Sequence, residues 1–61
     1  MFVRFVCNGY VVLERNLDYI PDNEDRIKVL DDFYVVDDRV FYFTKRESDD
    51  GVMIYLTKLS E

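Results

Sequence analysis

The stretch from Phe33 to Leu59 restricts the fold of this chain more than any other feature. It contains three runs rich in aromatic and β-branched residues, interrupted at Asp37-Asp38 and again from Glu47 to Gly51. Such runs favour β-strands, whereas aspartate and glycine favour the turns that join them. The stretch therefore predicts three antiparallel strands, with Gly51 at a turn position of positive φ.

The turn predicted at Asp37-Asp38 is either a two-residue turn or the middle of a four-residue turn that starts at Val36. Both versions give the same facing residues across the first two of these strands. Three pairs follow from it: Val35 with Val40, Tyr34 with Phe41, and Phe33 with Tyr42. Cross-strand pairs of this kind contribute roughly 0.2–1 kcal/mol each. The last run is apolar on both faces, with Val52, Ile54 and Leu56 on one and Met53, Tyr55 and Leu59 on the other.

An Asn8-Gly9 pair lies between two apolar runs near the start of the chain. This pair favours a type I′ turn, which requires positive φ at both central positions. The predicted hairpin spans residues 2–15 and pairs Cys7 with Tyr10 and Phe5 with Val12. Because both of its faces carry apolar side chains, a sheet with one fully wet face is not expected. The hairpin is expected to bend into a small barrel, or to be covered on its second face by another element or subunit.

Residues 16–26 form the one long irregular segment of the chain. Pro21 biases the residue before it toward an extended conformation. Leu17, Tyr19 and Ile20 are expected to fold inward against the core. The acidic residues of the segment then remain outside.

Two structures compete for the residues that follow. The first is a strand over 26–30, in which apolar and polar residues alternate, with its turn at Asp31-Asp32. The second is a short helix at about 22–31, in which Asp22 is the N-cap and Asp25 occupies the third helical position. We favour the strand because the segment is short for a helix and its isoleucine and valine favour strands. The helix is retained as the alternative.

These elements predict an all-β fold for a single small domain, residues 1–61. Five to six short antiparallel strands in up-and-down order would form a highly bent sheet or a small SH3-like barrel. The alternative with the short helix is an α+β fold. A chain of this size has a marginal core, and the usual aids are disulfides, metals or oligomerisation. Since Cys7 is the only cysteine and histidine is absent, a dense aromatic core comes first and a homodimer second.

The composition contains few of the residues that commonly act in catalysis. Histidine, the commonest general acid or base, is absent, and both glycines are explained by turns. Cys7 is expected to act as a small apolar residue of a strand. We therefore expect no enzyme, no cofactor and no metal site. A lone cysteine fits a reducing compartment, so the expected location is cytoplasmic, and the short apolar start is interpreted as a strand and not a leader.

The charge pattern narrows the class of partner. Thirteen acidic and eight basic residues give a net charge of −5, which argues against direct binding to nucleic acid or to an anionic membrane. Such a charge also keeps a small protein in solution, and aspartate is a common turn residue. The acids are nevertheless concentrated in the predicted turns, while the bases lie mostly along the predicted strands.

Chain direction in a meander places these acidic turns at two ends of the sheet. Asp31, Asp32, Asp49 and Asp50 are expected at one end, and Asp22, Glu24, Asp25, Asp37 and Asp38 at the other. Paired carboxylates can approximate the phosphates of a duplex, which follow one another about every 3.4 Å on each strand. The leading hypothesis is a non-enzymatic, viral-type inhibitor in the host cytoplasm that contacts a basic nucleic-acid-binding protein through these residues.

The alternative is an SH3-like adaptor or accessory subunit that binds a protein partner through an apolar and aromatic surface. Phe2, Val11, Leu13 and the tyrosines would carry that contact. A tyrosine-lined groove for a proline-rich peptide belongs to the same class of function.

Overall fold

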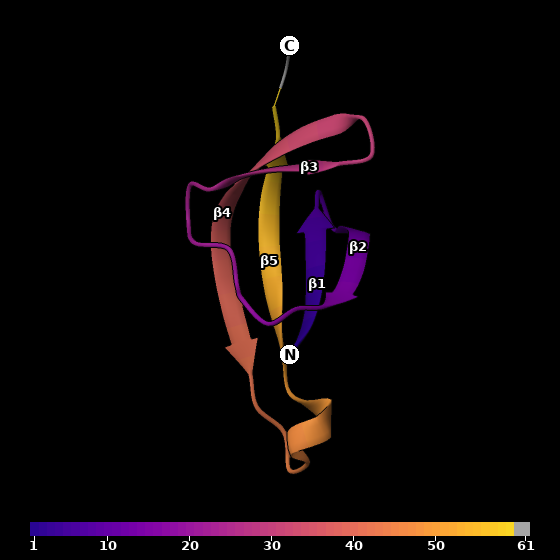
Figure 1. The fold of residues 1–61 in the computed structure, drawn as a ribbon, viewed down its shortest axis with the longest axis vertical. Helices are drawn as coiled ribbons and strands as arrows, with labels where there is room; N and C mark the ends of the chain where they lie inside the picture. Colours follow the sequence, from indigo (N-terminus) through magenta and orange to yellow (C-terminus); the bar gives the residue numbers. More distant parts are fainter. Residues whose placement is uncertain (60–61) are drawn as a thin grey trace.

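A computed structural model describes residues 1–59 of the chain. Within them lie five β-strands and one short 3-10 helix (Figure 1). Their bounds are β1 Phe2–Cys7, β2 Tyr10–Asn16, β3 Arg26–Val29, β4 Asp32–Tyr42, η1 Glu47–Asp49 and β5 Gly51–Lys58. The predicted all-β fold is confirmed, with five strands in one curled half-barrel sheet.

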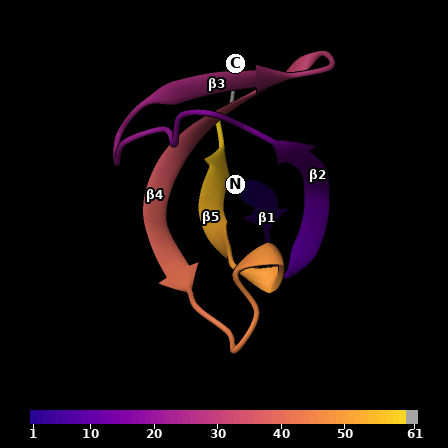
Figure 2. The ribbon, with the colours of Figure 1, turned by 60° about the horizontal axis from the view of Figure 1, so that its bottom comes forward.

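Strands that are consecutive in the chain are neighbours in the sheet, except β2 and β3. The sheet order is β2-β1-β5-β4-β3, and every pairing is antiparallel except that of β1 with β5. With an odd number of strands running up and down, the first and last point the same way, so they meet as a parallel pair. The sheet stays open between β2 and β3, and residues 17–25 connect the two strands across this opening (Figure 2).

The first hairpin has the predicted turn but a shifted register. Asn8 and Gly9 have φ of 53° and 80°, as a type I′ turn requires, and Cys7 pairs with Tyr10. An irregularity in the β1–β2 register then pairs Phe5 with Leu13. The predicted pairing of Phe5 with Val12 is therefore wrong, because a bulge admits one extra residue into one strand.

The turn predicted at Asp37-Asp38 does not exist. β4 continues through both residues and pairs with β5 along most of its length, with a β-bulge between Val36 and Asp38. Neither aspartate has positive φ, which a tight two-residue hairpin turn requires. The eight-residue β5 instead offers one partner to both halves of β4, and the bulge absorbs the mismatch.

The cross-strand pairs that depended on that turn are consequently wrong. Val35 pairs with Thr57, and Val40 with Met53, on β5. The aromatic residues of β4 likewise face other strands: Tyr34 pairs with Ile27 and Lys58, Phe33 with Lys28, Phe41 with Val52, and Tyr42 with Gly51.

The residues around position 27 form the favoured strand and not the helix. β3 and β4 make a hairpin in which Val29 pairs with Asp32, so the turn is Leu30-Asp31 and not the predicted Asp31-Asp32. Leu30 has φ of 55°, a left-handed conformation that favours glycine. Its side chain is 89% exposed and so gains almost nothing from packing.

Replacing Leu30 with glycine is therefore expected to stabilise the protein. The left-handed conformation costs a residue with a Cβ roughly 1–2 kcal/mol, and the greater unfolded-state freedom of glycine offsets part of the gain. The expected net increase in the free energy of unfolding is about 0.5–1 kcal/mol. Urea unfolding of the wild type and Leu30→Gly measures it. A lower urea midpoint for the variant would contradict the turn geometry.

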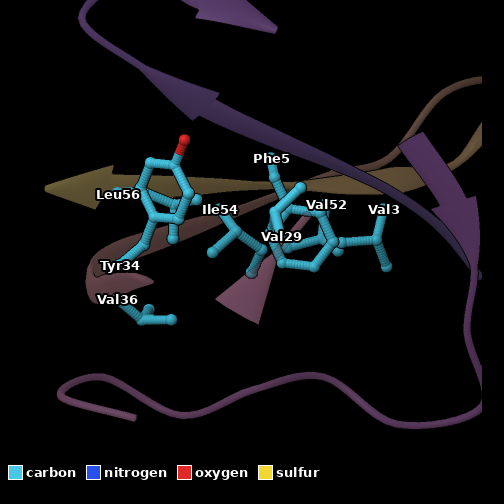
Figure 3. Packing of buried hydrophobic residues seen from close by; sticks show 8 residues of the cluster. All are labelled: Val3, Phe5, Val29, Tyr34, Val36, Val52, Ile54 and Leu56. Atoms are coloured by element: carbon cyan, nitrogen blue, oxygen red, sulfur yellow. The ribbon is translucent and has the colours of Figure 1, made fainter. Parts of the chain in front are cut away.

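The core lies on the concave face of the sheet (Figure 3). It consists of eight buried residues: Val3, Phe5, Val29, Tyr34, Val36, Val52, Ile54 and Leu56. The predicted alternation of β5 is confirmed, since its three core residues occupy every second position. Leu17 and Ile20 pack against the core as predicted, whereas Tyr19 is 71% exposed and its predicted inward position is wrong.

Candidate partner-binding surface

The acidic residues occupy three places and not two ends. The turn of the β3–β4 hairpin, with Asp31 and Asp32, lies at the top of Figure 1, whereas η1 and its neighbour Asp50 lie at the bottom. The prediction that these residues share one end is wrong. Because β4 runs straight through Asp37-Asp38, the chain reverses once less than predicted, and the later turn moves to the opposite end.

The remaining acids gather beside the middle of β4. The Glu24 N–H donates to the Val36 carbonyl at 2.7 Å, and the Val36 N–H donates to the Asp25 carbonyl at 2.9 Å. These two hydrogen bonds hold the segment before β3 against β4, directly before the bulge. Asp22, Glu24 and Asp25 therefore lie close to Asp37 and Asp38, and we call these five residues the acidic flank.

The bulge directs both of its aspartates to the convex face of the sheet. Asp38 pairs with Tyr55, and Thr57 lies two residues further along β5 on the same face. The Thr57 hydroxyl donates to Asp37 Oδ2. The extra residue of the bulge thus places two consecutive carboxylates on one side of β4, where a regular strand would alternate them.

Local hydrogen bonds hold several of these carboxylates in place. Asp25 Oδ2 accepts from the Asp22 N–H at 2.9 Å, and the Asp22 carbonyl accepts from the Asp25 N–H at 3.1 Å. Asp38 Oδ1 accepts from the N–H of Arg39 at 2.8 Å. The acidic flank is consequently attached to the sheet by backbone and side-chain bonds, so its charges have defined positions.

One cation lies inside the acidic flank. Arg39 Nη1 is 3.0 Å from Asp22 Oδ1 and donates to the Pro21 carbonyl at 3.3 Å. Residues 21–25 and 37–39 together carry five carboxylates and one guanidinium, for a formal charge of −4. The sequence indicates only that Arg39 is one of the basic residues along a strand. Its contacts with residues 21 and 22 show that it links β4 to the segment before β3.

The two end groups carry less free charge. Asp32 Oδ1 is 3.4 Å from Lys58 Nζ, a surface ion pair that offsets its charge. At the other end, Asp50 Oδ1 accepts from the Thr44 N–H at 2.6 Å and from its hydroxyl at 3.3 Å, which closes the loop around η1. A shallow cavity of about 420 Å³ near this loop is lined by Met1, Phe43, Glu47 and Asp50. Asp49 belongs to η1 itself.

The tyrosines do not form one groove. Tyr34 belongs to the core, whereas Tyr10 is 77% exposed at the Asn8-Gly9 turn. An apolar surface does exist on the convex face, where the register brings Val11, Val6 and Tyr55 into one row and Met53 and Val40 into the next. The sequence reasoning named Val11 but missed Val40, because it assigned Val40 to a different hairpin.

No group of three or more potential metal ligands occurs among residues 1–59. None of the helical structure described is long and apolar enough to cross a membrane. Searches against models of protein families, curated proteins and solved structures find no match to this chain.

Proposed function

We propose that this chain is a small non-enzymatic binding protein, of the kind that viruses encode, which inhibits a nucleic-acid-binding protein by presenting carboxylates in place of phosphates. The observation that carries the proposal is the acidic flank. Backbone hydrogen bonds hold two segments that are distant in the sequence side by side along β4, and residues 21–25 and 37–39 together carry a formal charge of −4. A target in a reducing cytoplasm suits a chain with a single free cysteine.

The physical basis is long-range attraction followed by short charge-assisted contacts. Concentrated charge of one sign accelerates encounters with a surface of the opposite sign, and the effect falls as salt increases. The longest dimension of the molecule is 42 Å, comparable to about twelve phosphate spacings of 3.4 Å. The three acidic groups are distributed along this dimension, with the most strongly charged one in the middle.

Neutralising the acidic flank is expected to abolish capture of the target. The variant D22N/E24Q/D25N/D37N/D38N removes five charges and keeps an acceptor oxygen at every position. It should lose at least about tenfold in recovery of a basic nucleic-acid-binding protein from a cell lysate at low salt. Immobilised protein, elution with duplex DNA and mass spectrometry of the eluate provide the measurement.

A matched control neutralises the two ends. D31N/D32N/E47Q/D49N/D50N also removes five charges but leaves the acidic flank intact, so it should retain most of the capture. Equal loss in both variants would show that net charge alone acts. Full capture by the flank variant would contradict the proposed contact surface.

A second candidate function is that of an adaptor which binds through the apolar rows of the convex face. Val11, Val40 and Tyr55 are each more than one third exposed there, and Arg4 and Glu14 form an ion pair beside them. A homodimer through this face belongs to the same proposal. A partner retained at high salt and unaffected by the flank variant would favour it.

A further inference from the structure

The lower part of β4 has one free edge. β3 pairs with β4 only as far as Val35, and the segment before β3 reaches only Val36. On the side of β4 away from β5, no further strand is present among the described residues. Both ribbon views show no other backbone segment beside the lower part of β4 on the side away from β5 (Figures 1 and 2). The edge runs from Asp38 to Tyr42.

Backbone groups at this edge are oriented away from β5. The Arg39 N–H donates to Asp38 Oδ1 and so does not take part in the β4–β5 ladder. Because alternate residues of a strand direct their backbone groups to the same side, the backbone N–H and carbonyl of Phe41 also face the free edge. An unpaired strand edge of this kind is a template for an added strand.

The side chains around the edge indicate what kind of strand it accepts. Val40 and Phe41 lie on opposite faces of β4 and are 47% and 42% exposed, so each face offers an apolar contact. The acidic flank adjoins the upper end of the edge. The two terminal strands of the sheet also have free edges: β2 carries Glu14 and Arg15 and is mixed in charge, whereas β3 carries Arg26 and Lys28 and is basic.

We propose that the free edge of β4, from Asp38 to Tyr42, accepts an extended basic segment of a partner protein as an additional strand. The inference rests on the proposed function, since it supplies the mode by which a basic target would be held once the acidic flank has attracted it. Backbone hydrogen bonds to Phe41 provide the register, apolar side chains of the segment contact Val40 and Phe41, and its lysines or arginines reach the acidic flank.

The test uses a fluorescein-labelled octapeptide of alternating lysine and valine, compared with the same peptide N-methylated at every residue. N-methylation keeps the charge and removes the backbone donors. Fluorescence anisotropy is expected to show binding of the unmodified peptide and a Kd at least about tenfold higher for the methylated one. Equal affinities would overturn strand addition, while attraction by the acidic flank would stand.

A variant isolates the edge of this protein. Phe41→Pro removes the outward N–H without breaking a bond to β5, and proline is tolerated at such edge positions. It is expected to weaken binding of the unmodified peptide at least about tenfold, whereas Phe41→Leu keeps the N–H and should stay within about threefold. Unchanged binding by a folded Phe41→Pro protein would overturn the proposal.

Amide hydrogen exchange of the wild type gives a readout that does not depend on the proline variant folding. The unmodified peptide is expected to slow exchange at Phe41 by about tenfold or more. Protection confined to the edge of β2 or of β3 would overturn the proposal. Peptide protection at Phe41 together with failure of the lysate capture would leave strand addition standing and remove the proposed function.

Discussion

Ile54→Ala is expected to remove a large part of the free energy of unfolding at 25 °C. Ile54 is fully buried in β5, the central strand, between Phe5 of β1 and Arg39 of β4. Truncating such a residue costs about 2–5 kcal/mol, because apolar contacts are lost and a cavity remains. A 61-residue domain has a total stability of only about 3–9 kcal/mol. Urea unfolding followed by circular dichroism measures the loss.

Val40→Ala is the matched control for this variant. Val40 is also a β-branched residue in the same sheet, but it lies on the convex face and is half exposed. Its truncation should cost less than about 1 kcal/mol. Comparable losses in the two variants would mean that the concave face is not the core.

Gly51→Ala is expected to weaken the junction of β1, β4 and β5. A Cβ at Gly51 would lie 2.7 Å from Tyr42 Cζ and 2.8 Å from the Phe2 carbonyl oxygen, and would also meet the Tyr42 hydroxyl. The tyrosine ring can swing aside, but Phe2 pairs with Gly51 in the parallel ladder and its backbone cannot move alone. Overpacking of this kind costs about 1–3 kcal/mol, measured as a lower urea midpoint.

Two comparisons separate the causes of that loss. In a Tyr42→Ala background, Gly51→Ala should cost less stability than in the wild type, because the clash with the ring is gone and only the contact with Phe2 remains. Gly9→Asn places a side chain where nothing lies within 4 Å, and asparagine tolerates the φ of 80° there, so it should change little. A neutral Gly51→Ala would contradict the close approach of the three strands.

The glycine at position 51 illustrates how far the sequence alone could lead. Its place next to an acidic loop predicted a turn residue of positive φ, but Gly9 is the one glycine with positive φ, and Gly51 begins β5. A glycine is required at this position because Tyr42 leaves no space for a Cβ. Such a requirement depends on tertiary contacts, and nothing in the local sequence expresses it.

Local patterns predicted the elements better than their connections. The hairpin around Asn8-Gly9, the strand at 26–29 and the core face of β5 all follow from turn chemistry and alternation of period two. Asp37-Asp38 resembles a turn by composition, and only the pairing of β4 with β5 decides that it is a bulge. Because β4 does not turn at these residues, the chain after them runs in the direction opposite to the predicted one.

The same difference decided the candidate surface. All nine acidic residues singled out from the sequence lie in the described part of the chain, and five of them form the acidic flank. The bulge and the backbone bonds between Val36 and residues 24–25 bring those five together. Non-local contacts of this kind leave no periodic signal, so the grouping could not be derived before the fold was known.

The most direct test of the account is a map of where a cationic ligand contacts this chain. The ¹⁵N-labelled protein is titrated with an octalysine peptide, and amide shifts are followed at low salt and at about 0.5 M salt, where screening is strong. We expect the largest shifts to fall on residues 22–25 and 37–39 and to disappear at high salt. Largest shifts at residues 31–32 and 47–50, with residues 22–25 and 37–39 unaffected, would contradict this expectation.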